Sequence, residues 1–168
     1  MRHSFDTRER PKARAGSPMD AALKFLSYRA RTAREVERHL DERQFGEVEI
    51  YETVERLKEL GLIDDRAFAE EFIRTRLAAK PLSRRRLYEQ LLSHELERET
   101  IEAALACVDE AREADNARAV ADKYMRQLAA LPEEERRRRV RQRLLSRGYS
   151  FEDADAALEA ALAAETAP

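Results

Sequence analysis

The sequence is poor in residues that interrupt helices or cross-link chains. Glycine and proline together account for nine of the 168 residues, tryptophan is absent, and Cys107 is the only cysteine. A single cysteine excludes an internal disulfide, and the scarcity of turn-forming residues disfavours a β-sandwich or a collagen-like chain. No apolar run approaches the ~20 residues of a membrane span, and the N-terminus lacks the apolar stretch of a signal peptide. We therefore expect a cytoplasmic protein that does not enter a membrane.

The residues that are abundant favour helices. Charged residues make up 39% of the chain, against about 25% in a typical protein. Hydrophobic residues make up 43%, and alanine, leucine, glutamate and arginine fill most positions. These side chains lose little conformational freedom in a helix. The net charge of −2 excludes a uniformly basic surface but leaves room for a local basic face. We therefore predict an all-α fold.

Hydrophobic periodicity and capping residues predict nine helices. Thr32 and Glu35 have the spacing of a capping box, and Pro132, followed by three glutamates, is typical of a first helical residue. Residues 1–18 show no apolar period and are expected to form a flexible tail, and residues 163–168 are expected to fray. The predicted helices span residues 19–29, 32–44, 47–60, 65–79, 83–94, 98–109, 112–129, 133–147 and 151–162.

Apolar positions recur along the chain at nearly constant offsets of 51 and then 53 residues. The matched sets are Val36, Leu40, Phe45, Ile50 and Val54; Leu87, Leu91, Leu96, Ile101 and Leu105; and Val140, Leu144, Tyr149, Ala154 and Leu158. Such a period is the signature of a repeat architecture. We therefore predict three tandem three-helix units, over residues 19–64, 65–111 and 112–162.

Charge alternates within each predicted unit. The segments around the third helices, 47–66, 99–116 and 150–168, carry net charges of −4, −5 and −5. The second helices are basic, and the most basic of them lies within residues 132–149, with three acidic residues and seven arginines. The near-zero total charge is therefore the sum of acidic and basic helices.

Outward-facing arginines recur at matched positions of the second helices. The predicted partner-binding or DNA-binding set is Arg34, Arg85, Arg86, Arg138, Arg139 and Arg143. A helical wheel places Arg138 and Arg139 away from Val140 and the core. Because arginine donates several fixed hydrogen bonds, a ladder of this kind suits phosphates or carboxylates on a polymeric partner. The alternative is a solvated helix face that pairs with nearby glutamates.

The sequence offers no catalytic residue, no metal site and no cofactor motif. His39 and His94 lack further ligands at metal-binding spacing, and the four glycines are too scattered to form a phosphate loop. We expect Cys107 to be a small core residue. In the pair Asp64 and Asp65, one aspartate is expected to cap the following helix and the other to favour its dipole.

Three stretches resemble the RecX family of bacterial recombination regulators. They are residues 57–69 (LKELGLIDDRAFA), residues 143–154 (RLLSRGYSFEDA) and residues 21–32 (AALKFLSYRART). The resemblance covers residues 19–162. One departure concerns the second unit, where the family often has glycine before and after the basic helix. Here those positions read Lys80-Pro81-Leu82-Ser83 and Ser93-His94-Glu95-Leu96, which leaves the geometry of the middle turn open.

The resemblance implies tandem three-helix repeats similar to helix-turn-helix units. It also implies a regulator, without catalytic residues, that binds the RecA recombinase filament on single-stranded DNA and limits recombinase activity in DNA repair, recombination and the SOS response. Some members of the family also bind free DNA. We therefore expect an elongated, curved, monomeric array that lies along the filament and presents the arginine face to it.

Two other interpretations stay open at this point. A helix-turn-helix transcriptional regulator predicts sequence-selective duplex binding without a recombinase. A purely protein-binding helical scaffold predicts no salt-dependent affinity for nucleic acid.

Overall fold

The structure, a computed structural model, describes residues 16–166 and forms nine helices and no strand over that range. The helices are α1 (Pro18–Leu26), α2 (Ala33–Glu42), α3 (Glu47–Glu59), α4 (Asp65–Ala79), α5 (Arg84–Leu92), α6 (Arg98–Leu105), α7 (Glu110–Gln127), α8 (Glu133–Ser146) and α9 (Phe151–Thr166). The predicted all-α fold is therefore confirmed.

The ends of the first and last helices differ from the prediction. Helix α1 begins at Pro18, within the predicted tail, because the Ser17 side chain caps it and proline suits the first helical position. Residues 1–15 of that tail lie outside the described residues. Helix α9 continues to Thr166, so the predicted frayed end is helical as far as that residue. An ion pair of 3.1 Å between Arg136 and Glu165 helps to hold this last turn against α8.

Capping interactions set the starts of the second helices. The capping box of Thr32 and Glu35 forms as predicted, and Ser83 caps α5 by accepting a hydrogen bond from the Arg86 backbone N–H at 3.1 Å. Pro132 is the residue before α8, where the sequence predicted the first residue within it. Its fixed φ suits either place, because neither position requires a backbone N–H donor.

Each three-helix unit buries its own hydrophobic core. The first core runs from Ala22 to Ile63, the second from Ala69 to Val108, and the third from Ala117 to Ala161. All fifteen residues of the matched apolar columns are buried. The repeat read from the spacing is thus a repeat of core positions.

The turn after each second helix also repeats. Gln44, Glu95 and Gly148 stand at matched positions, and all three have a left-handed backbone, with φ of 64°, 60° and 92°. A non-glycine residue adopts this conformation at a cost of about 1–2 kcal/mol. The middle turn therefore keeps the geometry of the other two although it lacks glycine.

The two junctions between units use the same positions but different donor atoms. At the first junction, the Thr32 hydroxyl donates to the carbonyl oxygen of His94 at 2.8 Å. At the second junction, the backbone N–H of Ser83 donates to the carbonyl oxygen of Arg147 at 3.1 Å. In both cases the donor is the residue that caps the second helix of one unit. The acceptor is a carbonyl of the next unit, and the residue after that carbonyl has the left-handed backbone.

A carboxylate from the next unit then completes each junction. Asp65 accepts a hydrogen bond from the backbone N–H of Ala33 at 2.8 Å, and Glu113 accepts one from that of Arg84 at 2.9 Å. These N–H groups open α2 and α5, where the chain has no intrahelical acceptor for them. Burial raises the pKa of the Asp65 carboxyl against the opposing effect of this hydrogen bond.

The first junction encloses the carboxylate of Glu35. This residue is 5% exposed, and its Oε1 lies 3.0 Å from the Arg29 guanidinium and 3.1 Å from Nδ1 of His94. Burial acts to raise the pKa of Glu35, but the hydrogen bonds from His94, Arg29 and the Thr32 backbone, with the charge of Arg29, outweigh it and lower the pKa below its ordinary value. The carboxylate is therefore held in its charged form.

This environment predicts a dependence of stability on pH. Because the folded pKa of Glu35 is lowered, its stabilising effect is complete above the unfolded pKa, roughly 4.3, and is lost as the pH falls through the folded value. We expect the Glu35→Gln variant to lose less stability than the wild-type protein when the pH falls from 6 to 3, measured as the free energy of urea unfolding at the two pH values. The raised pKa of Asp65 acts with the opposite sign in both proteins, so the comparison isolates Glu35. An identical pH profile for the two proteins would contradict the prediction.

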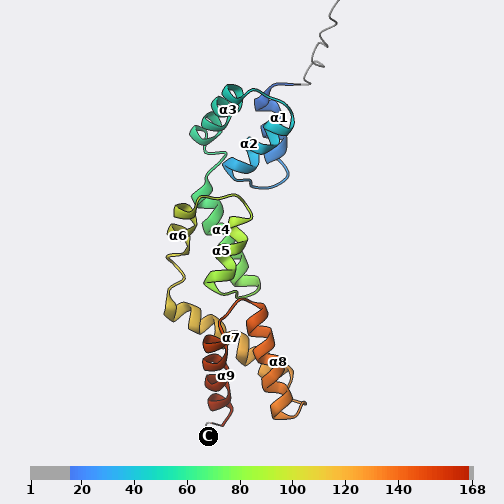
Figure 1. Ribbon diagram of the computed structural model, residues 1–168, viewed down its shortest axis with the longest axis vertical. Coiled ribbons are helices and arrows are strands. Elements are labelled where there is room, and N and C mark those ends of the chain that lie inside the picture. Colours follow the sequence, from blue (N-terminus) through green and yellow to red (C-terminus); the bar gives the residue numbers. More distant parts are fainter. Residues whose placement is uncertain (1–15, 167–168) are drawn as a thin grey trace, which may run out of the picture.

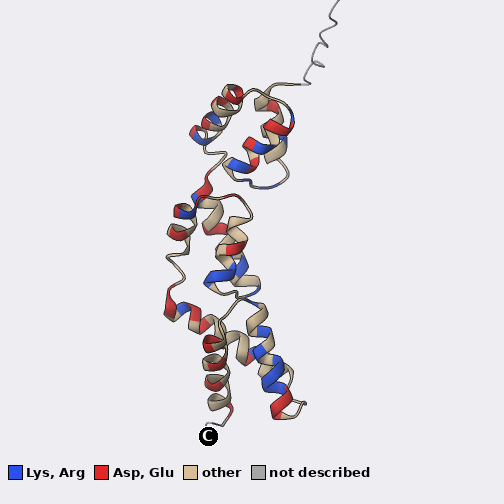
Figure 2. Ribbon diagram, in the orientation of Figure 1, with Lys and Arg blue, Asp and Glu red and all other residues tan. Residues whose placement is uncertain are grey.

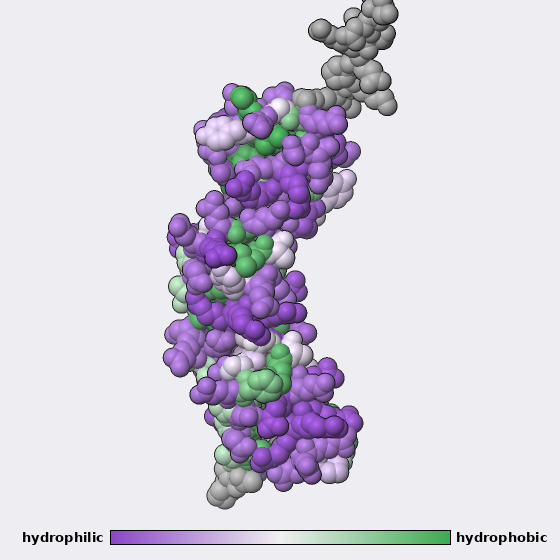
Figure 3. All heavy atoms as spheres, viewed as in Figure 1, coloured by the Kyte–Doolittle hydropathy of each residue, from purple (hydrophilic) through white to green (hydrophobic). Residues whose placement is uncertain are grey.

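The three units stack end to end into an elongated molecule. In Figure 1, α3, α6 and α9 lie along the left side, and α5 and α8 lie to their right. The outline in Figure 3 is bowed, with the middle unit set to one side of the two end units. The elongated, curved array expected from the sequence is therefore observed.

Two smaller expectations concern Cys107 and the aspartate pair. Cys107 is exposed, so its prediction as a core residue was wrong; α6 already ends at Leu105, and the thiol donates to the Ala104 carbonyl oxygen. Asp64 caps α4 by accepting from the backbone N–H of Ala67 at 2.9 Å, as predicted for one member of the pair. Asp65 lies in the first turn of α4, near the positive end of its dipole as predicted for the other member, and its side chain also accepts a hydrogen bond at the first junction.

Candidate functional site

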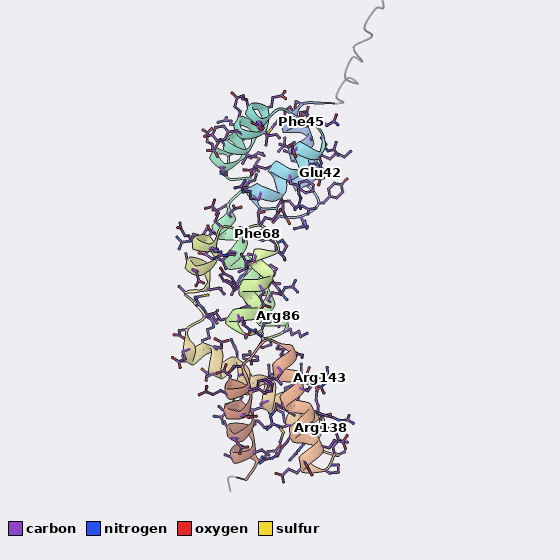
Figure 4. The ribbon with its side chains drawn as sticks, in the orientation of Figure 1. Glu42, Phe45, Phe68, Arg86, Arg138 and Arg143 are labelled. Carbon is purple, nitrogen blue, oxygen red and sulfur yellow. The ribbon has the colours of Figure 1, made fainter. Side chains whose placement is uncertain are left out.

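All six arginines predicted as a binding set are exposed, but they lie in different electrostatic surroundings. The set comprises Arg34 on α2, Arg85 and Arg86 on α5, and Arg138, Arg139 and Arg143 on α8. Figure 4 shows Arg86, Arg143 and Arg138 following one another in that order along the lower half of the molecule. The structure therefore brings part of the predicted ladder together and leaves Arg34 apart.

Arg34 lies in a groove between α2 and α3 that is rich in acidic residues. It pairs with Glu37 at 2.9 Å, and Asp41, Glu47 and Glu95 line the same groove. A phosphate chain in this groove would meet more carboxylates than guanidinium groups. The surroundings of Arg34 thus match the alternative of a solvated, ion-paired helix face.

Arg85 and Arg86 stand at the start of α5, beside the third unit. Arg86 pairs with Glu89 at 3.0 Å, and Nε of Arg85 is 4.0 Å from the same glutamate. The Cβ of Arg86 closely approaches Gly148 of the next unit. These two arginines therefore extend the basic surface toward the middle unit, but one carboxylate partly neutralises both.

The most basic groove lies between α7 and α8. It has a volume of about 620 Å³ and contains Arg138, Arg139 and Arg143, and no acidic residue lines it. Gln127 and Gln142 add amide groups that donate and accept hydrogen bonds. Figure 2 shows the basic residues gathered on α8, in contrast to the acidic residues of α9 beside it.

Tyr124 lies in this groove and was not among the sequence-predicted site residues. The guanidinium carbons of Arg143 and Arg147 lie 5.4 and 5.3 Å from the centre of its ring. Arg147, which is buried, also donates to the Tyr124 hydroxyl oxygen at 3.1 Å. The only signal in the sequence was a single aromatic residue in the polar end of α7. The half-buried Tyr124 ring therefore makes cation–π contacts with one exposed and one buried guanidinium group.

Ion pairing separates the arginines of α8 into two groups. Arg136, Arg137 and Arg141 pair with acidic residues of α9, at 3.1, 3.0 and 2.5 Å. On the groove side, Arg139 pairs with Glu135 at 2.6 Å, while Arg138 and Arg143 form no ion pair with any residue between 16 and 166. Within the run Arg136–Arg139, the first two arginines therefore join α8 to α9, and the last two face solvent on the groove side.

The surface chemistry of the groove is that of an anion-binding site. Guanidinium groups donate paired hydrogen bonds to phosphates and carboxylates, and unpaired ones lose no existing partner on binding. Over the described part of the chain, no group of three or more His, Cys, Asp or Glu side chains is arranged to hold a metal ion. No helix in that part is long and apolar enough to cross a bilayer.

Comparison with protein families assigns each unit separately. Residues 19–57 match the first three-helix domain of RecX, residues 64–105 match the second, and residues 111–158 match the third. The matches follow one another in the order of the three hydrophobic cores.

Individual relatives agree with these matches. The regulatory protein RecX of Mycolicibacterium smegmatis is 35% identical over 144 residues, which cover 83% of this chain and 77% of the relative. The regulatory protein RecX of Staphylococcus carnosus is 30% identical over 138 residues, and the match spans 82% of this chain but about half, 51%, of that longer protein.

A solved structure shows the same architecture. The crystal structure of RecX from Lactobacillus salivarius superposes with a TM-score of 0.75 at 25% identity, covering 87% of this chain and 95% of the other. The three-domain match, the sequence identity and the shared fold lead to one assignment: this chain belongs to the RecX family of regulatory proteins.

Proposed function

We propose that this chain binds the RecA recombinase filament on single-stranded DNA and limits recombinase activity, as a monomer in the cytoplasm and without catalytic chemistry of its own. The observation that carries the proposal is the α7–α8 groove, which no acidic residue lines and in which Arg138 and Arg143 are exposed and unpaired among the described residues, beside Arg139 paired with Glu135. In this proposal the groove contacts DNA phosphate, and the rest of the array contacts the recombinase.

The elongated shape supports a filament as the partner. An array of stacked units presents an extended, curved surface, and such surfaces suit partners that are themselves long and repetitive. Hydrogen bonds at both junctions hold neighbouring units in a defined arrangement. One molecule is therefore able to span several contacts on a helical partner.

The charge of α9, the third helix of the last unit, argues against a conventional helix-turn-helix repressor. Such a repressor inserts the last helix of its motif into the major groove. Helix α9 has five acidic residues and no lysine or arginine, so phosphates on both sides of a groove would repel it. The cations lie on α8, which supports contact with a DNA backbone more than readout of bases by the third helix.

Binding at two salt concentrations tests the proposal. We expect the full chain to bind the recombinase filament more tightly than bare single-stranded DNA, and duplex DNA weakest, with affinity falling between 50 and 200 mM salt, the range over which phosphate contacts weaken. Inhibition of recombinase ATP hydrolysis at the same protein concentrations measures the regulatory effect. Fluorescence anisotropy with labelled oligonucleotides gives the affinities.

The three interpretations give different results in this experiment. Tight, sequence-selective duplex binding without recombinase would replace the proposal with a repressor. Filament binding that does not change with salt would leave only a protein-binding scaffold. Binding without inhibition of ATP hydrolysis would refute the regulatory part of the proposal.

A further inference from the structure

A second groove lies where the first unit meets the second, remote from α8. It has a volume of about 660 Å³ and is formed by the loop after α1, the turn before α4, one face of α4 and His94. The residues that matter most for its chemistry are Arg31, Leu62, Ala67, Phe68, Phe72 and Arg76. It shares no lining residue with the α7–α8 groove.

Aromatic and aliphatic side chains form one part of the lining of this groove. The rings of Phe68 and Phe72 lie 5.1 and 5.3 Å from the ring of His94, both edge to face. Leu62 beside them is 49% exposed. Figure 4 places Phe68 at the level where the two units meet, and Figure 3 shows apolar atoms at the surface there. Exposed apolar surface of this kind at a concave site is typical of a place where another molecule binds.

Two arginines border the groove without an acidic partner. Arg31 lies with its guanidinium carbon 4.0 Å from the centre of the Phe25 ring, and its Nε is buried without a hydrogen-bond partner in the described chain. Burial, with the nearby charge of Arg29, lowers the pKa of Arg31. Arg76 lies 4.9 Å from the ring of Phe72. Neither Arg31 nor Arg76 forms an ion pair within residues 16–166. A partly desolvated cation is stabilised when an anion binds to it.

The acidic residues of the groove already have partners. Asp64 accepts from the backbone at the start of α4 at 2.9 Å, and Glu71 pairs with Arg74 and accepts from the Thr75 hydroxyl at 3.0 Å. Their oxygens are therefore engaged, as is Arg29 of the lining, which pairs with Glu35 at 3.0 Å, whereas Arg31 and Arg76 have no ion-pair partner among the described residues. The groove therefore presents two unpaired cations beside an apolar surface.

We propose that this groove binds an acidic segment of a partner protein, with an apolar side chain on Phe68 and Phe72 and carboxylates on Arg31 and Arg76. A peptide alternates apolar and charged side chains over short distances, which matches this lining. A nucleic-acid strand carries a phosphate at every nucleotide, and the fixed carboxylates of Asp64 and Glu71 repel it. A segment bound here touches both units and so holds the first junction in one arrangement.

Titration of the full chain with a defined probe tests the site. The probe is a ten-residue synthetic peptide with two Glu residues for Arg31 and Arg76, one Phe and one Leu three residues apart, and Ser and Gly at the other positions. The comparison probes are its Lys counterpart and a single-stranded oligonucleotide. We expect the acidic peptide alone to shift the backbone amide signals of Phe68 and Phe72 in NMR spectra. The double variant Arg31→Glu/Arg76→Glu is expected to weaken this binding about tenfold or more.

A matched variant controls for net charge. Arg56→Glu/Arg66→Glu makes the same change in charge at exposed arginines outside the groove and is expected to leave binding within about twofold. Phe68→Ala, checked for folding by circular dichroism, is expected to weaken binding without changing charge. Equal binding of the Lys peptide, shifts caused by the oligonucleotide at the same residues, or no binding up to about 1 mM would overturn the proposal. None of these outcomes bears on the α7–α8 groove, which the filament experiment tests separately.

Discussion

Replacing Arg138, Arg139 and Arg143 together by glutamate is expected to weaken binding to DNA in the recombinase filament by about 100-fold at 0.1 M salt. The reason is that these three arginines form the cationic surface of the only groove, among those described, whose charged lining residues are all basic. Each phosphate contact on single-stranded DNA contributes about 0.7 to the slope of log affinity against log salt, so three contacts contribute about 2. Extrapolated from 1 M to 0.1 M salt, a slope difference of 2 corresponds to about 100-fold.

The salt slope distinguishes a phosphate contact from a loss of folding. We expect the triple variant to show a slope lower by about 2, with an unchanged thermal unfolding midpoint, because all three side chains are exposed. A control triple variant, Arg56→Glu/Arg66→Glu/Arg74→Glu, makes the same change in net charge far from the groove. Equal losses of affinity in the two variants would show that only the total charge matters, and the α7–α8 groove would then have no special role.

Gly148→Ala is expected to destabilise the protein by about 2–5 kcal/mol. Two costs add at this position. The left-handed backbone, with φ of 92°, costs a residue with a side chain about 1–2 kcal/mol. The new methyl carbon would lie 2.5 Å from Oγ of Ser83 and 2.7 Å from Cβ of Arg86, and such overpacking costs about 1–3 kcal/mol. The displaced residues belong to the second junction, so the contact between units suffers as well.

Gly61→Ala is the matched control for the backbone cost. Gly61 also has a left-handed backbone, with φ of 66°, but a methyl group there would meet no atom within 4 Å. We expect this variant to lose only about 1–2 kcal/mol. Urea unfolding followed by circular dichroism measures both values. If Gly148→Ala costs no more than Gly61→Ala, the second junction is not closely packed at this glycine.

The Gly148 comparison also explains why the middle unit tolerates Glu95. At the first junction, Glu95 has the same left-handed backbone, and its carboxylate pairs across the junction with Arg38 at 2.5 Å. The contact to the preceding unit there is made by the Thr32 hydroxyl, whereas at the second junction it is made by the Ser83 backbone. The matched position therefore accepts a side chain at one junction and excludes it at the other. Alignment of the repeats alone gives no sign of this difference.

The helices, their caps and the repeat were determined by the sequence itself, because each depends on side chains within a few residues of one another. The i, i+4 spacing of Leu87 and Leu91 predicts a buried face whatever the rest of the chain does, and both residues are buried. The capping box of Thr32 and Glu35 likewise needs only three residues of separation. Local chemistry of this kind accounts for the helices and for their repeat along the chain.

Only the tertiary structure decided which arginines remain available. Arg137, Arg138 and Arg141 look alike in the sequence, yet Arg137 and Arg141 pair with Glu159 and Asp155 of α9, and Arg138 does not. These pairs join residues 14 or more positions apart, and the packing of α8 against α9 sets their distances. For the same reason the sequence did not predict the groove between the first and second units, because its Arg31 and Phe68 come from different units. The spacing of charged residues along a helix determines which charges lie on one face. The packing between helices determines which of those charges remain unpaired and available to a partner.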